Sequence, residues 1–503
     1  MPTRNNGGQK NYSKTLVRPA GRFTNTRSTL LSKIVTMLVL GGCFALIYFQ
    51  LIPRESSLLM EDMIDKIRPE EITNIHEITK TTSVHFRSQS PKAAAFEDYT
   101  KCMLQLEEYY QEFFPQYANA KQPFPTSVKI VDDQFYVIMS LFVTNDPGAW
   151  RQATYACNGV NGGIIYAFRK VAPTATIKCP QSLSPSSGAV ISSLSIVFNK
   201  GNETTTVEYN LNKFLECEQK DIALFGDTRN NTGSRSIKTG ITTSFAGDRQ
   251  EALEWAVYHH LVGFDHVWIY VNEPWEDGKD IPSLDFVTFI PFNNRVQDFM
   301  YRKNNTIEVF NLPVTEVFRV ASQNDALWRA KRLGLDWMAF PDLDELVVVG
   351  KSTYSNHLSS GPLKTYLANF KATHGDKYYG LLLRSVPYGK NIENKTRPEL
   401  LIDYTWRQDR NLTTDIFRAR RKVIVDVHKV NTVNIHYHGH GRLFIPESPE
   451  ELCINHYKKK DAGVYNTFNG WLSGRAIIED TRLRDEYRHR IVERLASIRE
   501  GRP

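Results

Sequence analysis

The chain has little of several features that would assign its class at once. It carries only 6 cysteines in 503 residues, and no two of them stand in the Cys-x-x-Cys spacing of structural zinc sites. No segment repeats at a fixed period and none is of low complexity, which argues against a solenoid or a disordered chain. No strand is followed by a phosphate-binding turn of the kind a sulfotransferase needs. The composition that remains is that of an ordinary folded protein, with 41% hydrophobic, 12% aromatic and 23% charged residues.

The excess of positive charge is confined to the N-terminus. The formal net charge is +7, and residues 1–33 hold seven bases and no acid, which leaves 55 bases against 55 acids in the rest of the chain. A neutral body has no basic stripe with which to bind a phosphate backbone. The sequence therefore predicts no nucleic-acid partner.

One uncharged run, Ile34 to Ile52, follows this basic tail. As a helix rising about 1.5 Å per residue, it would cross a hydrocarbon core of about 30 Å. A cleaved signal peptide is the alternative, but Pro53-Arg54-Glu55 offers no small-residue cleavage site. Because the bases precede the run, the positive-inside rule sends the residues beyond it across the membrane. We expect a single-pass type II membrane protein with a lumenal body, and the short span favours the Golgi membrane.

Sequons and cysteines beyond this run suit a lumenal compartment. Five Asn-x-Ser/Thr sequons lie there, at Asn202, Asn230, Asn304, Asn394 and Asn411. Five cysteines lie there as well, at Cys102, Cys157, Cys179, Cys217 and Cys453. Disulfides are permitted in such a compartment, so we expect one bridge among the three central cysteines and one cysteine left unpaired.

Changes in composition divide the chain into six segments. Residues from about 55 to 95 are polar and poor in aromatics, as in a stem, and those from about 125 to 220 form short alternating runs typical of a small β-rich domain. The predicted segments are a cytosolic tail (1–33), a transmembrane anchor (34–52), a stem (53–95), a β-rich lumenal domain (96–235), a catalytic α/β domain (236–480) and a C-terminal helix or tail (481–503).

Beyond residue 236 strands and helices alternate. We predict strands at 236–245, 266–271, 285–292 and 337–349, the last one broken by acids, and helices at 249–262 and 317–334. This alternation predicts a doubly wound, mainly parallel sheet with helices on both faces. Ligands bind such sheets beyond the carboxyl ends of the strands.

An acidic turn, Asp342-Leu343-Asp344-Glu345, stands where the apolar strand before it stops. In extended backbone Asp342 and Asp344 point to the same side, about 6 to 7 Å apart, so both can reach one divalent cation. Mg²⁺ or Mn²⁺ held by two carboxylates completes its shell with water and phosphate oxygens, which suits a nucleotide diphosphate. A solvated surface turn is the alternative. The buried strand before the turn and the polar run Gln323-Asn324-Asp325 in the preceding helix favour a site.

Three blocks in order resemble glycosyltransferase family 92: 254–274, 322–349 and 453–461, within a region from about 236 to 480. The matching residues are Glu254-Trp255, Gln323, the acidic turn and His456-Tyr457. The resemblance implies the nucleotide-diphospho-sugar transferase (GT-A) fold, a mixed α/β sheet with flanking helices, here preceded by the β-rich domain and one transmembrane helix. It also implies an inverting enzyme that moves a sugar from a UDP-sugar to a glycan or glycoprotein acceptor, with galactose as the first candidate for that sugar.

Inversion requires a base for the acceptor hydroxyl and a cation for the leaving group. We expect Asp342 and Asp344, with His456 as a third ligand, to hold Mn²⁺ or Mg²⁺. The expected donor-binding residues are Gln323, Asp325, Glu345, Lys422 and Lys458. The base stays open among Asp409, Asp415 and Glu254, with Asp403 a further candidate. Several of these residues have a structural alternative. His456 could be a core histidine, Lys422 a surface lysine and Lys458 part of a solvated lysine run. The candidate aspartates could be ordinary surface residues, and Glu254 could be a buried structural carboxylate.

Two rival hypotheses remain. His436, His438 and His440 would share one face of a strand and could bind zinc, but no carboxylate or cysteine stands at a ligand spacing. The protein could also be a non-catalytic glycan-binding or scaffolding membrane protein that keeps the fold. The presence of Asp342, Asp344 and His456 favours the enzyme.

Overall fold

The chain divides into two units, Met1–Arg87 and Ser88–Pro503, and the part that can be described belongs to the second. The computed structural model describes residues 91–119, 124–140, 153–167, 174–200, 203–225, 237–245, 249–272, 284–292, 314–350, 361–389, 406–408, 421–434, 441–448, 450–457 and 477–499. The predicted tail, the predicted anchor, nearly all of the predicted stem and the five sequons lie outside these ranges. Among the described helices, none combines the length and the apolar composition that crossing a bilayer would require.

The β-rich segment forms a sheet of seven described strands in the order β1-β2-β5-β4-β3-β6-β7, all antiparallel where they pair. Two of its tight turns use residues that tolerate positive φ. Asp132 and Asp133 connect β1 to β2, and Asn158 and Gly159 connect β3 to β4. The strands are β1 Phe124–Val131, β2 Gln134–Ser140, β3 Thr154–Cys157, β4 Val160–Ala167, β5 Thr174–Lys178, β6 Ser193–Lys200 and β7 Glu203–Asn210, with short 3₁₀ turns at Gln181–Leu183 and Pro185–Ser187.

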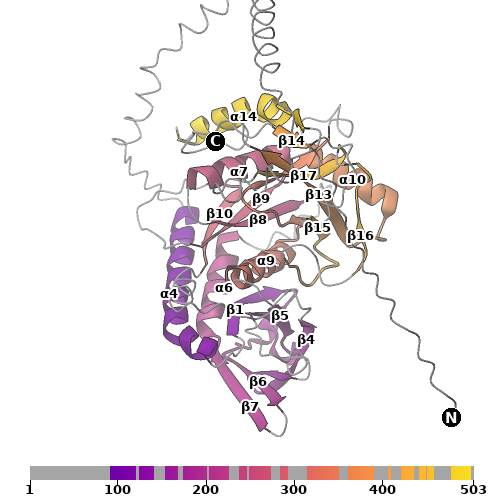
Figure 1. Cartoon of the computed structure of the whole chain (residues 1–503). Helices are drawn as coiled ribbons and strands as arrows, with labels where there is room; N and C mark the ends of the chain where they lie inside the picture. Colours follow the sequence, from indigo (N-terminus) through magenta and orange to yellow (C-terminus); the bar gives the residue numbers. More distant parts are fainter. Residues whose placement is uncertain are drawn as a thin grey trace, which may run out of the picture. The chain divides into compact units, whose positions relative to one another are not determined.

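The sequence pattern did not predict two helices, α4 (Pro91–Asn119) and α6 (Asn212–Phe225), which lie side by side (Figure 1). Helix α6 contacts β1 of this sheet. A disulfide joins the two helices, between Cys102 and Cys217. A second disulfide, Cys157–Cys179, lies within the β-rich segment, which confirms the expected internal bridge. Cys453, which is buried, belongs to neither disulfide, in line with the expectation of one cysteine outside the bridges.

The second sheet has eleven described strands and is mixed. Parallel pairing joins β10, β9, β8 and β11 in that order, and antiparallel pairing then adds β15, β13, β14 and β18. In this second half β12 also pairs antiparallel with β17, whereas β13 pairs parallel with β16 and β17. The expectation of a mainly parallel sheet is therefore wrong for this half, where antiparallel pairs predominate, while the mixed α/β class is confirmed. The strands are β8 Thr239–Phe245, β9 His266–Val271, β10 Val287–Pro291, β11 Trp337–Ala339, β12 Glu345–Val349, β13 Gly380–Gly389, β14 Trp406–Gln408, β15 Lys422–Asp426, β16 Leu443–Phe444, β17 Leu452–Tyr457 and β18 Ile477–Glu479.

Helices cover both faces of this sheet (Figure 1). On one face lie α7 (Arg249–Val262), α10 (Pro362–His374) and α14 (Arg482–Arg499), which form one core with Ile241, Val267 and Ile269. On the other lies α9 (Val314–Arg332), in a core shared with the β-rich segment. Neighbouring residues of a strand point to opposite faces, so Trp268 belongs to the second core while Val267 belongs to the first.

Candidate functional site

The acidic turn interrupts the chain between two strands. Strand β11 ends at Ala339, and β12 begins at Glu345 and pairs with a different neighbour, β17. The turn closes on itself, because the Asp342 N–H donates to Glu345 Oε2 at 2.8 Å and the Glu345 N–H donates to the Asp342 carbonyl at 3.0 Å. Since β11 runs parallel to β8, the turn lies at the carboxyl end of these parallel strands. This is the edge at which α/β sheets bind ligands.

Strand β12 is held on both sides. On one side it pairs with β17 in a register that sets Glu345 opposite His456. On the other side, side chains of α7 replace a neighbouring strand: Trp255 Nε1–H donates to the Glu345 carbonyl at 2.9 Å, and the Tyr258 hydroxyl donates to the Val347 carbonyl at 3.0 Å. The backbone groups next to the acidic turn are therefore satisfied without a further strand.

His259 completes this contact between α7 and β12 in its neutral form. Its Nδ1 bonds to the Trp255 carbonyl at 2.8 Å, and its Nε2 accepts the Val347 N–H at 3.2 Å. One ring nitrogen donates and the other accepts, which only the neutral imidazole can do. Burial lowers the pKa of His259 to about 3, so the ring stays neutral near pH 7.

Six charged or ionisable side chains converge at the turn, and we call them the acid-turn cluster: Asp342, Asp344, Glu345, Arg319, Lys422 and His456. Asp342 pairs with Arg319 of α9 and, at 2.8 Å, with Lys422 Nζ of β15. Lys422 Nζ is also 3.4 Å from Glu345 Oε2. His456 Nε2 is 3.4 Å from Asp344 Oδ2, and its Nδ1 is 3.7 Å from Glu345 Oε1. The two aspartates thus face different partners.

The cluster is graded in exposure. The side chains of Asp342 and Asp344 are 27% and 33% exposed, whereas Glu345 and Lys422 are buried. Burial lowers the pKa of Lys422 to about 8, although Glu345 and Asp344 oppose the shift. Burial tends to raise the pKa of Asp344, but the hydrogen bond and charge of His456 and the charges of Lys422 and Arg319 leave it lowered. Asp344 is therefore ionised and accessible at neutral pH.

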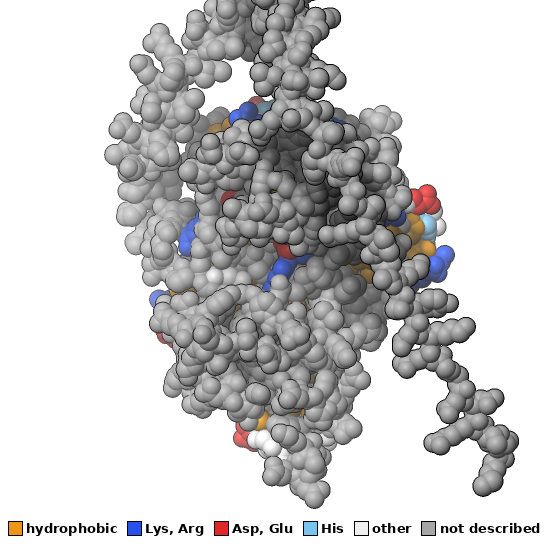
Figure 2. Space-filling view, viewed as in Figure 1, with side chains coloured by type: hydrophobic (Ala, Val, Ile, Leu, Met, Phe, Trp, Pro, Cys, Tyr) orange, Lys and Arg blue, Asp and Glu red, His pale blue; other side chains and the backbone are white. Residues whose placement is uncertain are grey.

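The cluster sets three carboxylates against the cations Arg319 and Lys422 and the imidazole of His456. In the space-filling view, basic and acidic side chains border each other over the region of α9 (Figure 2). Within the described ranges, no three His, Cys, Asp or Glu side chains are arranged so that they could hold a metal ion. Asp344 and His456 form the nearest arrangement, with two donors.

Of the remaining predicted site residues, Gln323, Glu254 and Asp325 lie in the described ranges. Gln323 is buried on α9, and its amide oxygen accepts no hydrogen bond from the described residues. Glu254 is half-buried on α7 and accepts a bond from Gln250 at 3.2 Å. The residues outside the described ranges are Lys458, Asp403, Asp409, Asp415, His436, His438 and His440.

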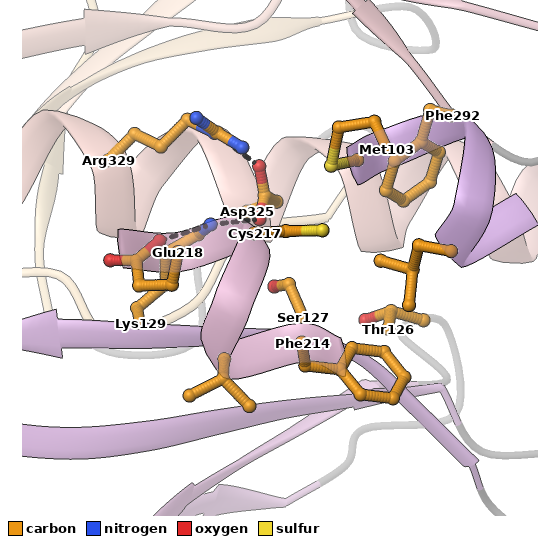
Figure 3. Close-up of a pocket in the computed structure, with 12 residues that line it drawn as sticks. Met103, Thr126, Ser127, Lys129, Phe214, Cys217, Glu218, Phe292, Asp325 and Arg329 are labelled. Carbon is orange, nitrogen blue, oxygen red and sulfur yellow. Dashed lines mark hydrogen bonds and ion pairs between the residues drawn. The ribbon is translucent and has the colours of Figure 1, made fainter. Parts of the chain in front are cut away.

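The structure places Asp325 away from the acid-turn cluster. Its carboxylate accepts from Arg329 Nε at 2.6 Å and pairs with Lys129 Nζ at 2.9 Å (Figure 3). It also accepts a hydrogen bond from the Tyr270 hydroxyl. A cavity of about 10 Å³ lies beside these residues, which is room for about one water molecule and none for a nucleotide. The carboxylate of Asp325, which was expected to bind the donor, is thus engaged with buried partners in the interior.

Sequence reasoning missed Arg319. The signal was available, because Arg319 stands four residues before Gln323 and so lies one helical turn away on the same helix. The polar run from 323 to 325 drew attention to the middle of α9, whereas the contact with Asp342 comes from the preceding turn of the helix.

The family model for glycosyltransferase family 92 matches residues 243–498. The match covers half of the chain and includes every member of the acid-turn cluster. The chain belongs to glycosyltransferase family 92. The chain therefore carries a glycosyltransferase domain, and the expected resemblance is confirmed. The matched region begins within β8, so the β-rich segment lies before it. Comparison with curated proteins gives no match.

Proposed function

We propose that this family 92 protein is a metal-dependent, inverting glycosyltransferase that moves a sugar from a UDP-sugar to a glycan or glycoprotein acceptor. Galactose is the first candidate for that sugar. One observation carries the proposal: the acid-turn cluster combines accessible carboxylates with two cations at the carboxyl end of parallel strands. Carboxylates suit a divalent cation, and the cations suit a diphosphate. A nucleotide-diphospho-sugar presents both partners at once.

The donor set fits Mn²⁺ or Mg²⁺ in part. Asp344 Oδ2 and His456 Nε2 are 3.4 Å apart, near the ~3 Å expected for adjacent ligands with bonds of about 2.1 Å. Asp342 already faces Arg319 and Lys422, so it is the weaker candidate as a direct ligand. We propose Asp344 and His456 as metal ligands, with Asp342 as a third ligand or as a second-layer partner. When bound, the ion would act as a Lewis acid on the leaving diphosphate.

The other side chains of the cluster have complementary tasks. Arg319 and Lys422 place two positive charges beside Asp342, where they can stabilise the negative charge that develops on the departing diphosphate. Buried Glu345 partners Lys422 and accepts the Asp342 N–H, which orients the turn. Gln323 offers a buried amide oxygen to a donor group. Lys458 stays a proposed diphosphate ligand.

Inversion needs a base that removes the proton of the acceptor hydroxyl as that oxygen attacks the anomeric carbon. Asp409 and Asp415 stay the proposed bases. Glu254 is the less favoured one, because its carboxylate accepts a hydrogen bond from Gln250 on the same helix. We further propose a GT-A type of fold, a single N-terminal anchor and a lumenal location in the Golgi membrane.

The test is turnover of UDP-sugars by the purified full chain. A panel of UDP-sugars is incubated with and without Mn²⁺, and the release of UDP is measured against the Asp344→Asn variant. We expect release with one donor, a requirement for Mn²⁺, and loss of release in the variant. An Asp376→Asn variant, altered at an exposed carboxylate that pairs with Lys429, is the matched control and should keep full activity.

Two results would contradict the proposal. One is release that is equal in the wild type and the Asp344→Asn variant. The other is binding of a glycan without release of UDP from any donor, which would support the non-catalytic glycan-binding alternative.

A further inference from the structure

Helix α9 connects two separate groups of charged side chains. Arg319, in its first half, belongs to the acid-turn cluster. Asp325, Arg329 and Arg332, in its second half, belong to a buried group that includes residues of the β-rich segment. At about 1.5 Å per residue, Arg319 and Arg329 are about 15 Å apart along the helix axis. The same rigid element therefore contacts the candidate site and the β-rich segment.

The buried group, which we call the α9 network, draws on four other elements. Its members besides the three α9 residues are Lys129 of β1, Glu218 and Asp221 of α6, Tyr99 of α4 and Tyr270 of β9. Arg329 donates from Nη2 to the Tyr99 hydroxyl at 2.7 Å and from Nη1 to Asp221. Arg332 donates to Glu218 at 2.7 Å and to Asp221.

The α9 network is electrically balanced. Three cations, Lys129, Arg329 and Arg332, meet three anions, and Lys129 Nζ lies between two of them, 3.0 Å from Glu218 and 2.9 Å from Asp325 (Figure 3). All six side chains are at most 5% exposed. A balanced group in which every charged side chain is paired tolerates little displacement, because moving one member leaves a buried charge unpaired.

The α9 network also restrains rotation of the helix about its axis. Asp325, Arg329 and Arg332 stand at i, i+4 and i+7, so they form one stripe along α9, and partners from four elements hold that stripe. Arg319 projects from a different side of the helix. A small rotation of α9 would therefore move the Arg319 guanidinium relative to Asp342.

We propose that Arg329, together with the α9 network, is a positioning residue for donor binding: the β-rich segment sets the orientation of α9 and thereby the placement of Arg319 at the acid-turn cluster. The inference rests on the proposed function, since it assigns Arg319 to the diphosphate of the donor. On this inference the β-rich segment contributes to donor binding, because its residues hold α9, the helix that carries Arg319.

The mildest probe is Tyr99→Phe, which removes one hydroxyl and leaves the charge balance intact. Its matched control is Tyr366→Phe on α10. This change also removes one hydroxyl, which donates a hydrogen bond to the Glu451 carboxylate at 2.9 Å. UDP affinity in the presence of Mn²⁺ is measured by calorimetry on the full chain, together with the thermal midpoint. We expect Tyr99→Phe to weaken UDP binding by about threefold to tenfold and the control to leave it unchanged.

A double-mutant cycle separates positioning from a general loss of stability. Arg319→Lys keeps a positive charge and with it a measurable affinity, but loses the two-armed guanidinium. In that background we expect Tyr99→Phe to have no further effect on UDP affinity. Equal weakening in both backgrounds, or no weakening in either, overturns the inference.

Two further observations keep the outcomes distinct. Hydrogen exchange without nucleotide should be faster for the amides of residues 319–324 in Tyr99→Phe than in the wild type, and unchanged exchange overturns the inference. If the wild type does not bind UDP, the proposed function fails and this inference fails with it. If the wild type binds UDP and the variant binds equally well, only the inference fails.

Discussion

The α9 network and the acid-turn cluster are built from the same residue types but differ in burial and balance. In the network three cations meet three anions, all buried. In the cluster three carboxylates meet two cations, and two of the carboxylates are partly exposed. The pKa values differ in the same way. Although burial opposes it, Asp221 and Asp325 raise the pKa of Arg329 above its usual range, whereas burial dominates for Lys422 and lowers its pKa.

The difference teaches which charges serve the fold and which are available to a ligand. A cation whose pKa is raised is stabilised in its charged form by its surroundings, so it contributes to stability. A cation whose pKa is lowered is held charged at a cost, as side chains at functional sites often are. The partly exposed carboxylates of the acid-turn cluster, by contrast, stay accessible to a ligand of positive charge.

The largest effect should come from Arg329→Met. The change leaves Asp221 and Asp325 buried without their main partner, so we expect a loss of about 3–5 kcal/mol in the free energy of unfolding, measured by urea denaturation. Lys331→Met, on the same helix but outside the network, is the control and should cost about 1 kcal/mol or less. Equal losses of stability in the two variants would contradict the claim that the α9 network stabilises the fold more than other charged residues of the same helix do.

Asp344→Asn should have the opposite profile. The side chain is 33% exposed, so we expect a change in stability of less than about 1 kcal/mol. UDP-sugar turnover should fall by about 10² to 10³, because the charge that faces His456 and the proposed metal is lost. The measurement pairs an unfolding curve with initial rates. If the Asp344→Asn variant is destabilised but keeps its activity, Asp344 serves the fold rather than a ligand, and the contrast between the cluster and the α9 network fails.

His259 adds a third case to the comparison of the α9 network with the acid-turn cluster, because it is buried against backbone groups rather than charged side chains. Its folded pKa of about 3 lies below the unfolded value of 6.5, so the unfolded chain binds the proton first as the pH falls. Stability from this residue is thus complete above pH 6.5 and declines below it, by about 2 kcal/mol at pH 5. Unfolding of the wild type and His259→Gln at pH 7 and pH 5 measures this, and equal pH dependence in both would contradict it.

Lys422→Met should give the smallest change in stability. Because burial lowers the pKa of Lys422 to about 8 from 10.5, the protonated form is disfavoured in the folded state. Removing the charge at pH 7 relieves this cost but leaves buried Glu345 without its cation, so we expect the two effects to offset each other to a net change of about 1 kcal/mol or less, whereas UDP affinity should fall. Between pH 8 and 10.5 the unfolded chain binds more protons, so wild-type stability should rise with pH relative to the variant. A loss comparable to that of Arg329→Met would contradict this.

Much of the α/β fold could be predicted from local patterns. The helix predicted at 249–262 has the bounds of α7, and the strand predicted to be broken by acids is β11 followed by β12. Helix α4 was missed although Tyr99, Cys102, Met103 and Leu106 follow the spacing of one buried helix face. The antiparallel half of the large sheet could not be predicted, because periodicity within a strand carries no information about the direction of its neighbour.

The candidate site was predictable only in part. Asp344 and His456 were expected to lie together and do, because β12 and β17 pair in a register that sets Glu345 opposite His456. The contact of Lys422 with the acidic turn was not predicted, since Lys422 was expected only as a donor-binding residue. The contact of Arg319 with Asp342 and the interior position of Asp325 could not be predicted either, because spacing along α9 does not say which side of the helix meets which neighbour.

The sequence by itself determined the periodicity of each helix and strand, the position of the acidic turn at the end of a buried strand, and the family to which the chain belongs. Only the tertiary structure decided which charged side chains became structural and which stayed available. The physical reason is that the state of a charge depends on burial and on partners brought from distant segments, such as Tyr99 and Asp221 at Arg329. Residues six apart on one helix, Arg319 and Asp325, therefore came to belong to different groups.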